Sequence, residues 1–171
     1  MTDFDFSENE VQRYARHIVL KEVGGTGQMM LKRGRVLIVG AGGLGSPLAM
    51  YLAAAGVGTI GIVDADTVEL SNLQRQIAHG MRDIGTPKVD SAKSTMADMN
   101  PDITVHTYNA RLDAGNVMDL IADYDVIADG SDNFETRFLL NDACYLAGKT
   151  LVSGAALRFD GQVSTFKAHL G

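Results

Sequence analysis

Cysteine and tryptophan are almost missing from this 171-residue sequence, which contains one cysteine, Cys144, and no tryptophan. A single cysteine excludes an internal disulfide framework and a cysteine-rich zinc site within the chain, and it is more typical of a reducing compartment. Aromatic residues make up 6% and proline occurs three times, whereas glycine occurs 19 times. This composition excludes collagen-like, disordered and coiled-coil chains and favours a fold with many tight backbone turns.

Positive charge is also scarce, since 15 Lys and Arg residues stand against 21 Asp and Glu residues and the formal net charge is −6. We therefore expect no broad electrostatic surface for nucleic acid or for an anionic membrane. The acidic N-terminus lacks the apolar region of a secretory signal, so a cytoplasmic location is expected. Residues 36–63 carry no charge and are long enough to span a bilayer, but seven glycines and Pro47 divide them. We interpret this stretch as a buried β-α-β unit.

Strand and helix patterns alternate from Arg35 onward. Short apolar runs rich in β-branched residues predict strands, and the segments between them predict helices of about ten residues. This alternation predicts an α/β fold with a Rossmann-like, doubly wound, mostly parallel sheet and helices on both faces. The expected strands are 35–40, 59–66, 103–108, 124–130 and 150–155, and the expected helices are 46–56, 86–99, 115–122 and 133–146.

The two ends of the chain depart from this alternation. Ser7 and Glu10 fit a capping box that begins a helix to about Leu20, and glycines 24, 25 and 27 are expected to end it before a short helical turn at 29–32. Residues 158–168 alternate like a β-hairpin, with a turn signal at Asp160–Gly161. Because the sequence stops directly after an expected strand, we expect a C-terminal part of a larger protein to be missing.

A glycine-rich segment, GAGGLG at 40–45, lies between an expected strand and an expected helix. Glycines allow the backbone to turn sharply and to approach a phosphate, and the following helix offers unpaired N–H groups and the positive end of its dipole. The next expected strand reaches Asp64, 19 residues beyond Gly45, where a carboxylate can accept hydrogen bonds from ribose hydroxyls. The alternative is that the glycines only permit helix-on-strand packing. Their placement favours nucleotide binding.

Three further polar segments follow the carboxyl ends of expected strands, the edge at which open α/β sheets bind ligands. They are SNLQRQ at 71–76, PK at 87–88 and GSDN at 130–133. We expect them to bring Asn72, Arg75, Lys88 and Asp132 to one crevice. Arg75 and Lys88 can neutralise phosphate charge, and Asp132 can hold a Mg²⁺ ion that bridges phosphates. A triphosphate needs this array more than the pyrophosphate of a dinucleotide does.

Together these elements resemble the ThiF/MoeB/HesA family, the bacterial relatives of ubiquitin-activating enzymes. The resemblance extends over nearly the whole chain, and LSNLQRQ followed by the PK and SDN elements is its most specific part. The stretch VSGAALRFDGQ is more similar to the MoeB branch, the molybdopterin-synthase adenylyltransferases, than to the ThiF branch. Matching stretches are RYARHIVL (13–20), RVLIVGAGGLGSP (35–47), YLAAAGVG (51–58), LSNLQRQ (70–76), PKV (87–89), NPDI (100–103), DGSDNFETR (129–137) and LVSGAALRFDGQV (151–163).

The resemblance implies an ATP-dependent adenylyltransferase. It would activate the C-terminal glycine carboxylate of a ubiquitin-like sulfur-carrier protein of the MoaD/ThiS type, ending in Gly-Gly, as an acyl-adenylate for molybdopterin or thiamine biosynthesis. It also implies ATP and Mg²⁺ as cofactors, Asp132 as the magnesium ligand, and a homodimer in which Arg16 reaches the ATP of the other subunit. The implied catalytic residues are Arg16, Arg75, Lys88 and Asp132. The implied nucleotide-binding residues are Gly40, Gly42, Gly43, Asp64, Ser71, Asn72, Leu73, Gln74, Arg75, Lys88, Asp132 and Asn133.

The sequence departs from the family at its C-terminal side. Relatives continue with two CxxC pairs that bind zinc and often with a reactive cysteine, but this chain contains no ligands for that zinc, and Cys144 is expected to be buried among apolar neighbours. We expect a helical arm at 1–34 and a nucleotide-binding α/β domain at 35–171 that is C-terminally incomplete. One alternative is a catalytically incomplete fragment that dimerises and binds the carrier.

A second alternative is a NAD(P)-binding oxidoreductase. The glycine-rich segment and Asp64 also suit NAD(P), and Tyr145 and Lys149 have the Y-x-x-x-K spacing of short-chain dehydrogenases. Gly148 lies between them and directly before an expected strand. We therefore interpret the spacing as a chance match.

Overall fold

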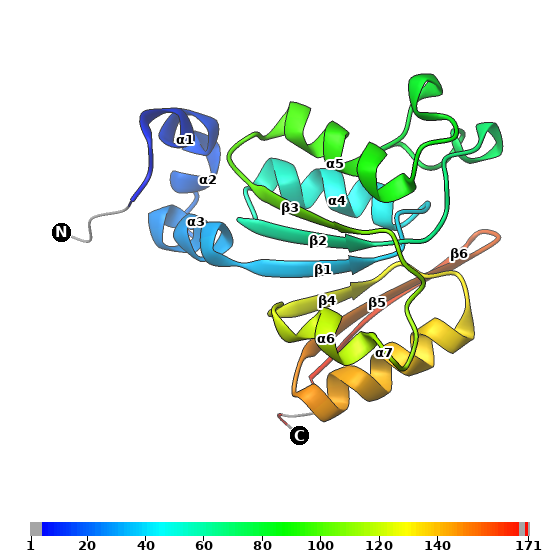
Figure 1. Cartoon of the computed structure of the whole chain (residues 1–171). Coiled ribbons are helices and arrows are strands. Elements are labelled where there is room, and N and C mark those ends of the chain that lie inside the picture. Colours follow the sequence, from blue (N-terminus) through cyan, green and yellow to red (C-terminus); the bar gives the residue numbers. More distant parts are fainter. Residues whose placement is uncertain (1–4, 168–169, 171) are drawn as a thin grey trace.

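A six-stranded sheet of order β3-β2-β1-β4-β5-β6 forms the centre of the computed structural model, which describes residues 5–167 and 170 (Figure 1). Strands β1 to β5 pair in parallel, and β6 pairs antiparallel with β5. The Rossmann-like, doubly wound, mostly parallel fold is thereby confirmed. The strands are β1 (Arg35–Val39), β2 (Thr59–Val63), β3 (Thr104–Tyr108), β4 (Val126–Asp129), β5 (Thr150–Leu157) and β6 (Asp160–Phe166). The helices are α1 (Glu8–Arg13), α2 (Ala15–Ile18), α3 (Gly24–Arg33), α4 (Gly45–Ala55), α5 (Lys88–Met99), α6 (Val117–Ala122) and α7 (Phe134–Ala147), with 3-10 turns η1 (Leu70–Asn72) and η2 (Met81–Asp83).

Strand β1 is buried on both faces because helices cover both sides of the sheet. Leu37 and Val39 belong to a core with residues of α6 and α7, whereas Ile38 belongs to a second core with residues of α4 and α5. Figure 1 shows these two helix pairs on opposite faces. The uncharged stretch 36–63 is thus a β1-α4-β2 unit, as interpreted from the sequence. None of the described helices combines the length and the apolar character needed to cross a bilayer.

The N-terminal helix begins as predicted but is interrupted. The capping box is confirmed, since the Ser7 hydroxyl accepts the Glu10 N–H and the Glu10 carboxylate accepts the Ser7 N–H. A single helix to Leu20 is wrong, because the chain breaks at Tyr14 between α1 and α2. The buried Tyr14 hydroxyl accepts a hydrogen bond of 2.8 Å from Asn100 Nδ2 at the end of α5. This distant contact fixes the break.

The glycine break expected at residues 24–27 is also wrong, because these glycines form the first turns of α3. Each glycine costs a helix about 1 kcal/mol relative to alanine. Tertiary hydrogen bonds offset this cost: fully buried Gln28 contacts His17 Nδ1 at 2.8 Å and donates to the Ala55 carbonyl at 2.9 Å. Figure 1 shows α1 to α3 beside the amino ends of the parallel strands.

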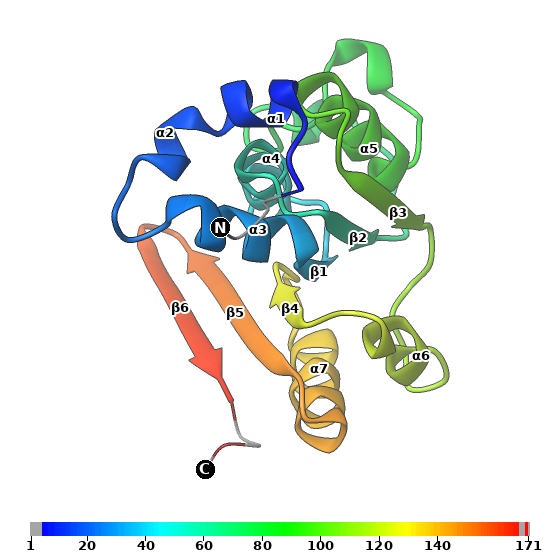
Figure 2. The same cartoon turned by 90° about the vertical axis from the view of Figure 1, so that its left-hand side faces the viewer.

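The C-terminal hairpin is present, but its turn is not at Asp160–Gly161. Strand β5 extends to Leu157, and the chain reverses at residues 158–159, where Arg158 has a φ of +56°. Asp160 pairs with Leu157 and Gly161 with Ala156, so the predicted turn residues lie inside the strand ladder. These two additional residue pairs lengthen the hairpin and move its turn to residues 158–159. Figure 2 shows β5 and β6 at the edge of the sheet next to α7; residue 168 lies outside the described residues.

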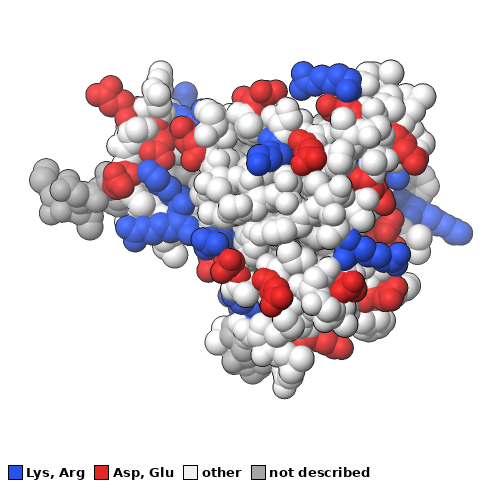
Figure 3. Space-filling view, viewed as in Figure 1, with Lys and Arg blue, Asp and Glu red and all other residues white. Residues whose placement is uncertain are grey.

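Positive and negative side chains are interspersed on the face of the molecule shown in Figure 3. Some Lys and Arg side chains adjoin one another at the left of this view, near α3, and the other basic side chains stand apart.

Candidate nucleotide-binding site

The glycine-rich segment 40–44 joins β1 to α4 at the carboxyl edge of the sheet. Gly40 has a φ of +91°, and a Cβ atom at Gly45 would lie 1.8 Å from the Gly40 carbonyl oxygen, so the backbone requires glycine at both positions. Cβ atoms at Gly42 and Gly43 would meet nothing closer than 3.7 Å and 3.6 Å, respectively. Packing alone does not explain these two glycines. Their bare backbone suits a ligand group, such as a phosphate, that approaches it closely.

Asp64 lies directly after β2 and contacts the glycine segment. Its Oδ2 atom accepts the Ala41 N–H at 2.7 Å, and its Oδ1 atom accepts the Asp66 N–H at 2.8 Å. An ionised carboxylate has about four lone-pair positions. Asp64 therefore retains acceptor capacity for ribose hydroxyls after both backbone contacts.

The segment after η1 lies over the glycine-rich segment 40–44, which we call the glycine loop. The Cβ position of Gly43 is 3.6 Å from Arg75 Cδ, and that of Gly42 is 3.7 Å from Gln76 Nε2. The Arg75 side chain is exposed and donates to the Ser71 carbonyl at 3.2 Å. Gln76 is 3% exposed, and its Oε1 atom has no hydrogen-bond partner among the described residues. The buried side chain beside Gly42 thus has an unpaired oxygen, which a hydrogen-bond donor from a ligand or a water molecule can satisfy.

The other residues predicted in this segment have local structural contacts. Asn72 is buried, and its Oδ1 atom accepts the Glu69 N–H at 3.1 Å. The Ser71 hydroxyl contacts the Glu69 carboxylate at 3.2 Å, and Gln74 Nε2 donates to the Ser71 carbonyl at 3.3 Å. Leu73 is half-buried. These contacts hold the turn that presents Arg75.

Lys88 is the first residue of α5 and is almost fully buried. Its Nζ atom pairs with Asp66 Oδ2 at 2.7 Å, while the Asp66 side chain is 71% exposed. Because the Asp66 N–H is bound to Asp64, this ion pair lies beside the proposed ribose-binding carboxylate. The structure thus brings a buried cation to the same edge as Arg75.

Asp132 and Asn133 follow β4 in a segment that lies against the glycine loop. The Gly130 N–H donates to the Val39 carbonyl at 2.9 Å, and the Gly130 carbonyl oxygen is 3.0 Å from the Cβ position of Gly40. Asp132 is exposed. Asn133 caps α7, since its Oδ1 atom accepts the Thr136 N–H at 2.9 Å.

Sequence reasoning missed the buried carboxylate that supports this segment. Asp129 Oδ1 accepts from the backbone N–H and the hydroxyl of Ser131, and Asp129 Oδ2 accepts from the Ser153 hydroxyl at 2.7 Å. Arg137 Nε lies 3.3 Å from Asp129 Oδ2, and Arg137 Nη2 donates to the carbonyls of Ser131 and Gly154. An aspartate in the otherwise apolar run VIAD was the available signal. His79, which contacts the Ala41 carbonyl at 3.0 Å, was missed as well.

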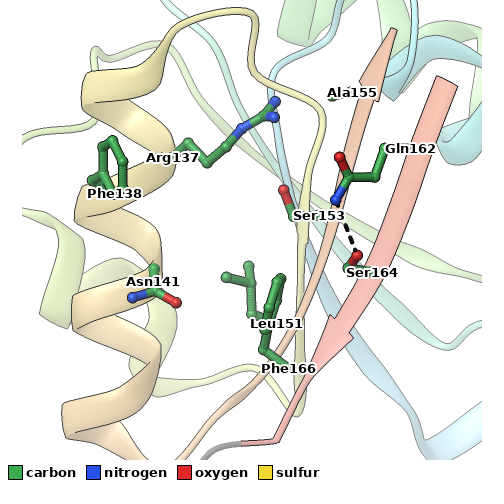
Figure 4. Close-up of a pocket in the computed structure, with 9 residues that line it drawn as sticks. All are labelled: Arg137, Phe138, Asn141, Leu151, Ser153, Ala155, Gln162, Ser164 and Phe166. Carbon is green, nitrogen blue, oxygen red and sulfur yellow. Dashed lines mark hydrogen bonds between the residues drawn. The ribbon is translucent and has the colours of Figure 1, made fainter. Parts of the chain in front are cut away.

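A pocket of about 260 Å³ lies between α7 and the β5–β6 hairpin (Figure 4). Phe138, Leu151 and Phe166 give it apolar walls, and Arg137 and Ser153 line its polar part. Both of these polar residues contact Asp129. The pocket therefore adjoins the support of the Asp132 segment rather than the glycine loop itself.

One predicted residue is not brought to this edge by the described chain. Arg16 is exposed on α2, beside the amino ends of the strands and away from the glycine loop (Figure 1). No group of three or more His, Cys, Asp or Glu side chains suited to a metal ion occurs among residues 5–167 and 170. A Mg²⁺ ion is commonly held by one or two carboxylates together with substrate phosphates. The single exposed carboxylate of Asp132 fits that type of site.

The remaining sequence candidates have structural explanations. Helix α7 ends before Gly148, whose φ is +63°, and Lys149 Nζ donates to the carbonyls of Ala122 and Tyr124 at 2.7 Å each. Lys149 is thus not part of a dehydrogenase pair with Tyr145. Cys144 is buried, as expected, and burial raises the pKa of its thiol to about 11.

Residues 14–171 match the model of the ThiF family. The chain belongs to this family. It is 54% identical over 160 residues to the probable adenylyltransferase/sulfurtransferase MoeZ of Mycobacterium tuberculosis, covering 94% of this chain and 41% of that protein. It is 51% identical over 156 residues to the SAMP-activating enzyme E1 of Haloferax volcanii, covering 91% and 58%, and 48% identical over 165 residues to the adenylyltransferase and sulfurtransferase MOCS3 of Culex quinquefasciatus, covering 96% and 38%. The chain thus spans only about 40 to 60% of the length of these ThiF-family relatives.

Solved ThiF-like structures have the same fold. PaaA superimposes with a TM-score of 0.85 at 27% identity, covering 98% of this chain and 54% of that one. Escherichia coli MccB, in a crystal with AMPCPP and MccA, gives a TM-score of 0.80 at 24% identity, covering 89% and 47%. The second likeness shows the fold alone.

Proposed function

We propose that this ThiF-family chain is an ATP-dependent adenylyltransferase that acts on the C-terminal glycine carboxylate of a ubiquitin-like sulfur-carrier protein. The observation that carries the proposal is the bare backbone at Gly42 and Gly43, over which the Arg75 side chain lies. Relatives named adenylyltransferases support the reaction class. The carrier is proposed to be of the MoaD/ThiS type, with the reaction taking place in the cytoplasm and serving molybdopterin or thiamine biosynthesis.

The nucleotide would bind along the carboxyl edge of the sheet. Asp64 accepts hydrogen bonds from the ribose hydroxyls, while Gly42 and Gly43 leave room for the phosphates. Arg75 and Lys88 supply two positive charges to the triphosphate. The carboxylate of Asp132 would hold Mg²⁺, which would supply positive charge to the phosphates. Ser71 to Gln74 and Asn133 complete the proposed walls of the site.

The reaction needs no nucleophile from the protein. A C-terminal carboxyl group has a pKa of about 3.3 to 3.7 and is already ionised near pH 7. Its oxygen forms a bond to the α-phosphorus while the bond from that phosphorus to the bridging oxygen breaks, giving acyl-adenylate and pyrophosphate. The barrier is mainly repulsion between two anions, so fixed cations and accurate positioning provide the catalysis.

Arg16 belongs to a second part of the proposal, a homodimer. Because α2 lies at the amino ends of the strands, Arg16 is remote from the glycine loop of its own chain. A second copy would have to supply this arginine to each nucleotide. Purified protein that is monomeric while retaining full exchange activity would contradict this part alone.

The decisive experiment is ATP–pyrophosphate exchange with a carrier ending in Gly-Gly. Asp132→Ala and Arg75→Ala are expected to reduce exchange at least about a hundredfold, the loss typical for a key electrostatic contact. Both side chains are exposed, so the melting temperature should remain unchanged. Arg82→Ala, at an exposed arginine on η2, is the matched control and should exchange normally. Near-normal exchange in either site variant, or binding of NADH without binding of ATP, would refute the assignment.

A further inference from the structure

A buried histidine connects the two phosphate-facing elements of the proposed site. His79 is 7% exposed, with its Nε2 atom 3.0 Å from the Ala41 carbonyl oxygen and its Nδ1 atom 2.9 Å from the Ser91 hydroxyl. Ala41 lies in the glycine loop, and Ser91 lies in the first turn of α5, which begins at Lys88. One imidazole thus joins the loop to the helix that carries the buried cation.

The contact with Ala41 defines which ring nitrogen carries a proton. A carbonyl oxygen only accepts hydrogen bonds, so Nε2 carries the proton and donates to Ala41. In the neutral ring Nδ1 is then an acceptor, and the Ser91 hydroxyl donates to it. Burial lowers the pKa of His79, the Ala41 contact opposes this, the charge of Lys88 lowers it further, and Asp83 and Asp64 raise it. The net lowering keeps the ring neutral.

The backbone on both sides of Ala41 is fixed by residues outside the loop. Its N–H donates to Asp64, and its carbonyl accepts from His79 Nε2 and from the Ser46 hydroxyl at 3.2 Å. A carbonyl that rotated toward a bound phosphate would repel it. Hydrogen bonds that hold this carbonyl inward therefore keep the loop in the form that an anion can approach.

We propose that His79 is a positioning residue for the nucleotide, which holds the Ala41 carbonyl away from the phosphates and fixes the loop relative to Lys88. This inference rests on the proposed nucleotide-binding function. In this proposal His79 contacts neither the nucleotide nor the carrier. It acts through the Ala41 peptide and through Ser91.

Two variants separate positioning from simple packing. The amide nitrogen of His79→Gln reaches the place of Nε2 and can still donate to Ala41, whereas that of His79→Asn reaches only the place of Nδ1, near Ser91. Both lose the ring, so both should lower the melting temperature by similar amounts. Loss of the His79 contact leaves the Ala41 carbonyl with the Ser46 hydroxyl alone. This loss is expected to raise the Kd for Mg·ATP about tenfold in His79→Asn, while His79→Gln stays within about threefold of wild type.

Calorimetric titration of the 171-residue chain with Mg·ATP measures this difference. In the ATP–pyrophosphate exchange assay, the KM for ATP should likewise be higher in His79→Asn than in His79→Gln, and kcat should change less than KM. Equal Kd values in the two variants, or a wild-type Kd in His79→Asn, would overturn the inference.

Amide hydrogen exchange of the ligand-free protein tests the same contact without nucleotide. The loop amides at 41–43 are expected to exchange faster in His79→Asn than in His79→Gln. If wild-type protein fails to bind ATP but this difference is observed, the proposed function fails and the positioning of the loop by His79 stands. Equal exchange in the two variants refutes the positioning role, whatever the outcome for ATP.

Discussion

Lys88 and Asp66 form an ion pair of 2.7 Å in which the ammonium group is almost fully buried and the carboxylate is mostly exposed. A buried ammonium without a counter-charge is costly, whereas an exposed carboxylate gains little from a single partner. Asp66 therefore supplies the counter-charge that orients the buried ammonium group, and its exposed carboxylate can be displaced at low cost by the phosphates of the proposed nucleotide. An anion of higher charge than a single carboxylate would therefore bind Lys88 more strongly than Asp66 does.

Asp66→Asn tests this relationship. We expect the free energy of unfolding of the ligand-free protein to fall by about 1 to 2 kcal/mol, because Lys88 loses its counter-charge. Stabilisation by saturating Mg·ATP should become larger than in wild type, since the phosphates then supply the only partner. Urea unfolding with and without nucleotide measures both quantities. Asp98→Asn removes an exposed carboxylate that pairs with exposed Arg82, and it serves as the control. Identical behaviour of the two variants would contradict the role of Asp66.

Gly43→Ala and Gly45→Ala should separate nucleotide binding from folding. A Cβ atom at Gly45 would overlap the Gly40 carbonyl, so Gly45→Ala is expected to destabilise the protein by about 3 kcal/mol or more. Gly43→Ala meets only ordinary contacts and should change stability by less than about 0.5 kcal/mol, while weakening Mg·ATP binding at least about tenfold. Thermal melting and calorimetric titration check the two effects. Wild-type ATP affinity in Gly43→Ala would show that no phosphate lies against this backbone.

His79 predicts a pH dependence of stability. Burial holds its folded-state pKa below the ordinary value of 6.5, so below that pH the unfolded chain binds a proton that the folded chain does not. The contribution to stability is therefore present above pH 6.5 and is lost as the pH falls, by up to about 1.4 kcal/mol per pH unit for one proton. Urea unfolding of wild type and His79→Gln between pH 7.5 and 5 should give a steeper decline for wild type. The other histidines are common to both proteins and cancel; parallel curves would exclude this account.

Cys144 should be inert in the native protein. Its thiol is buried and its pKa is raised to about 11, so the reactive thiolate is rare at pH 8. Alkylation by iodoacetamide is expected to be at least about a hundredfold slower than in urea-unfolded protein, as followed by intact mass. Comparable rates in the two states would show that α7 opens readily. The unfolded sample is the internal control for reagent activity.

The sheet and the glycine loop could be predicted because their signals are local. Apolar runs alternate with helix-length segments. Gly40 and Gly45 are required by the conformation and close approach of the neighbouring backbone. The break at Tyr14 could not be predicted in this way, because it depends on a hydrogen bond to Asn100, 86 residues away. The hairpin turn at Arg158 likewise depends on how far β6 pairs with β5, which no dipeptide signal encodes.

The site residues differ in the same way: some could be predicted from local signals, and others depend on distant contacts. Arg75 and Lys88 follow from strand order, since parallel strands end at one edge. Their partners do not: Asp66 is one of several acids after β2, and nothing in the sequence near His79 indicates a contact with Ala41, 38 residues earlier. Long-range side-chain contacts of this kind become visible only when the backbone is in place.

The position of β1 between β2 and β4 determines when, during synthesis, the glycine loop can be completed. The residues after β2 that contact the loop are made soon after β1. Gly130, which contacts the loop from the other side, follows β4. The contacts between β1 and β4 join residues 90 apart. At 5 to 20 residues per second, a ribosome needs roughly 5 to 20 s to make the intervening chain. A nascent chain therefore carries an unfinished loop throughout that interval, with the apolar face of β1 that later meets α6 and α7 still uncovered.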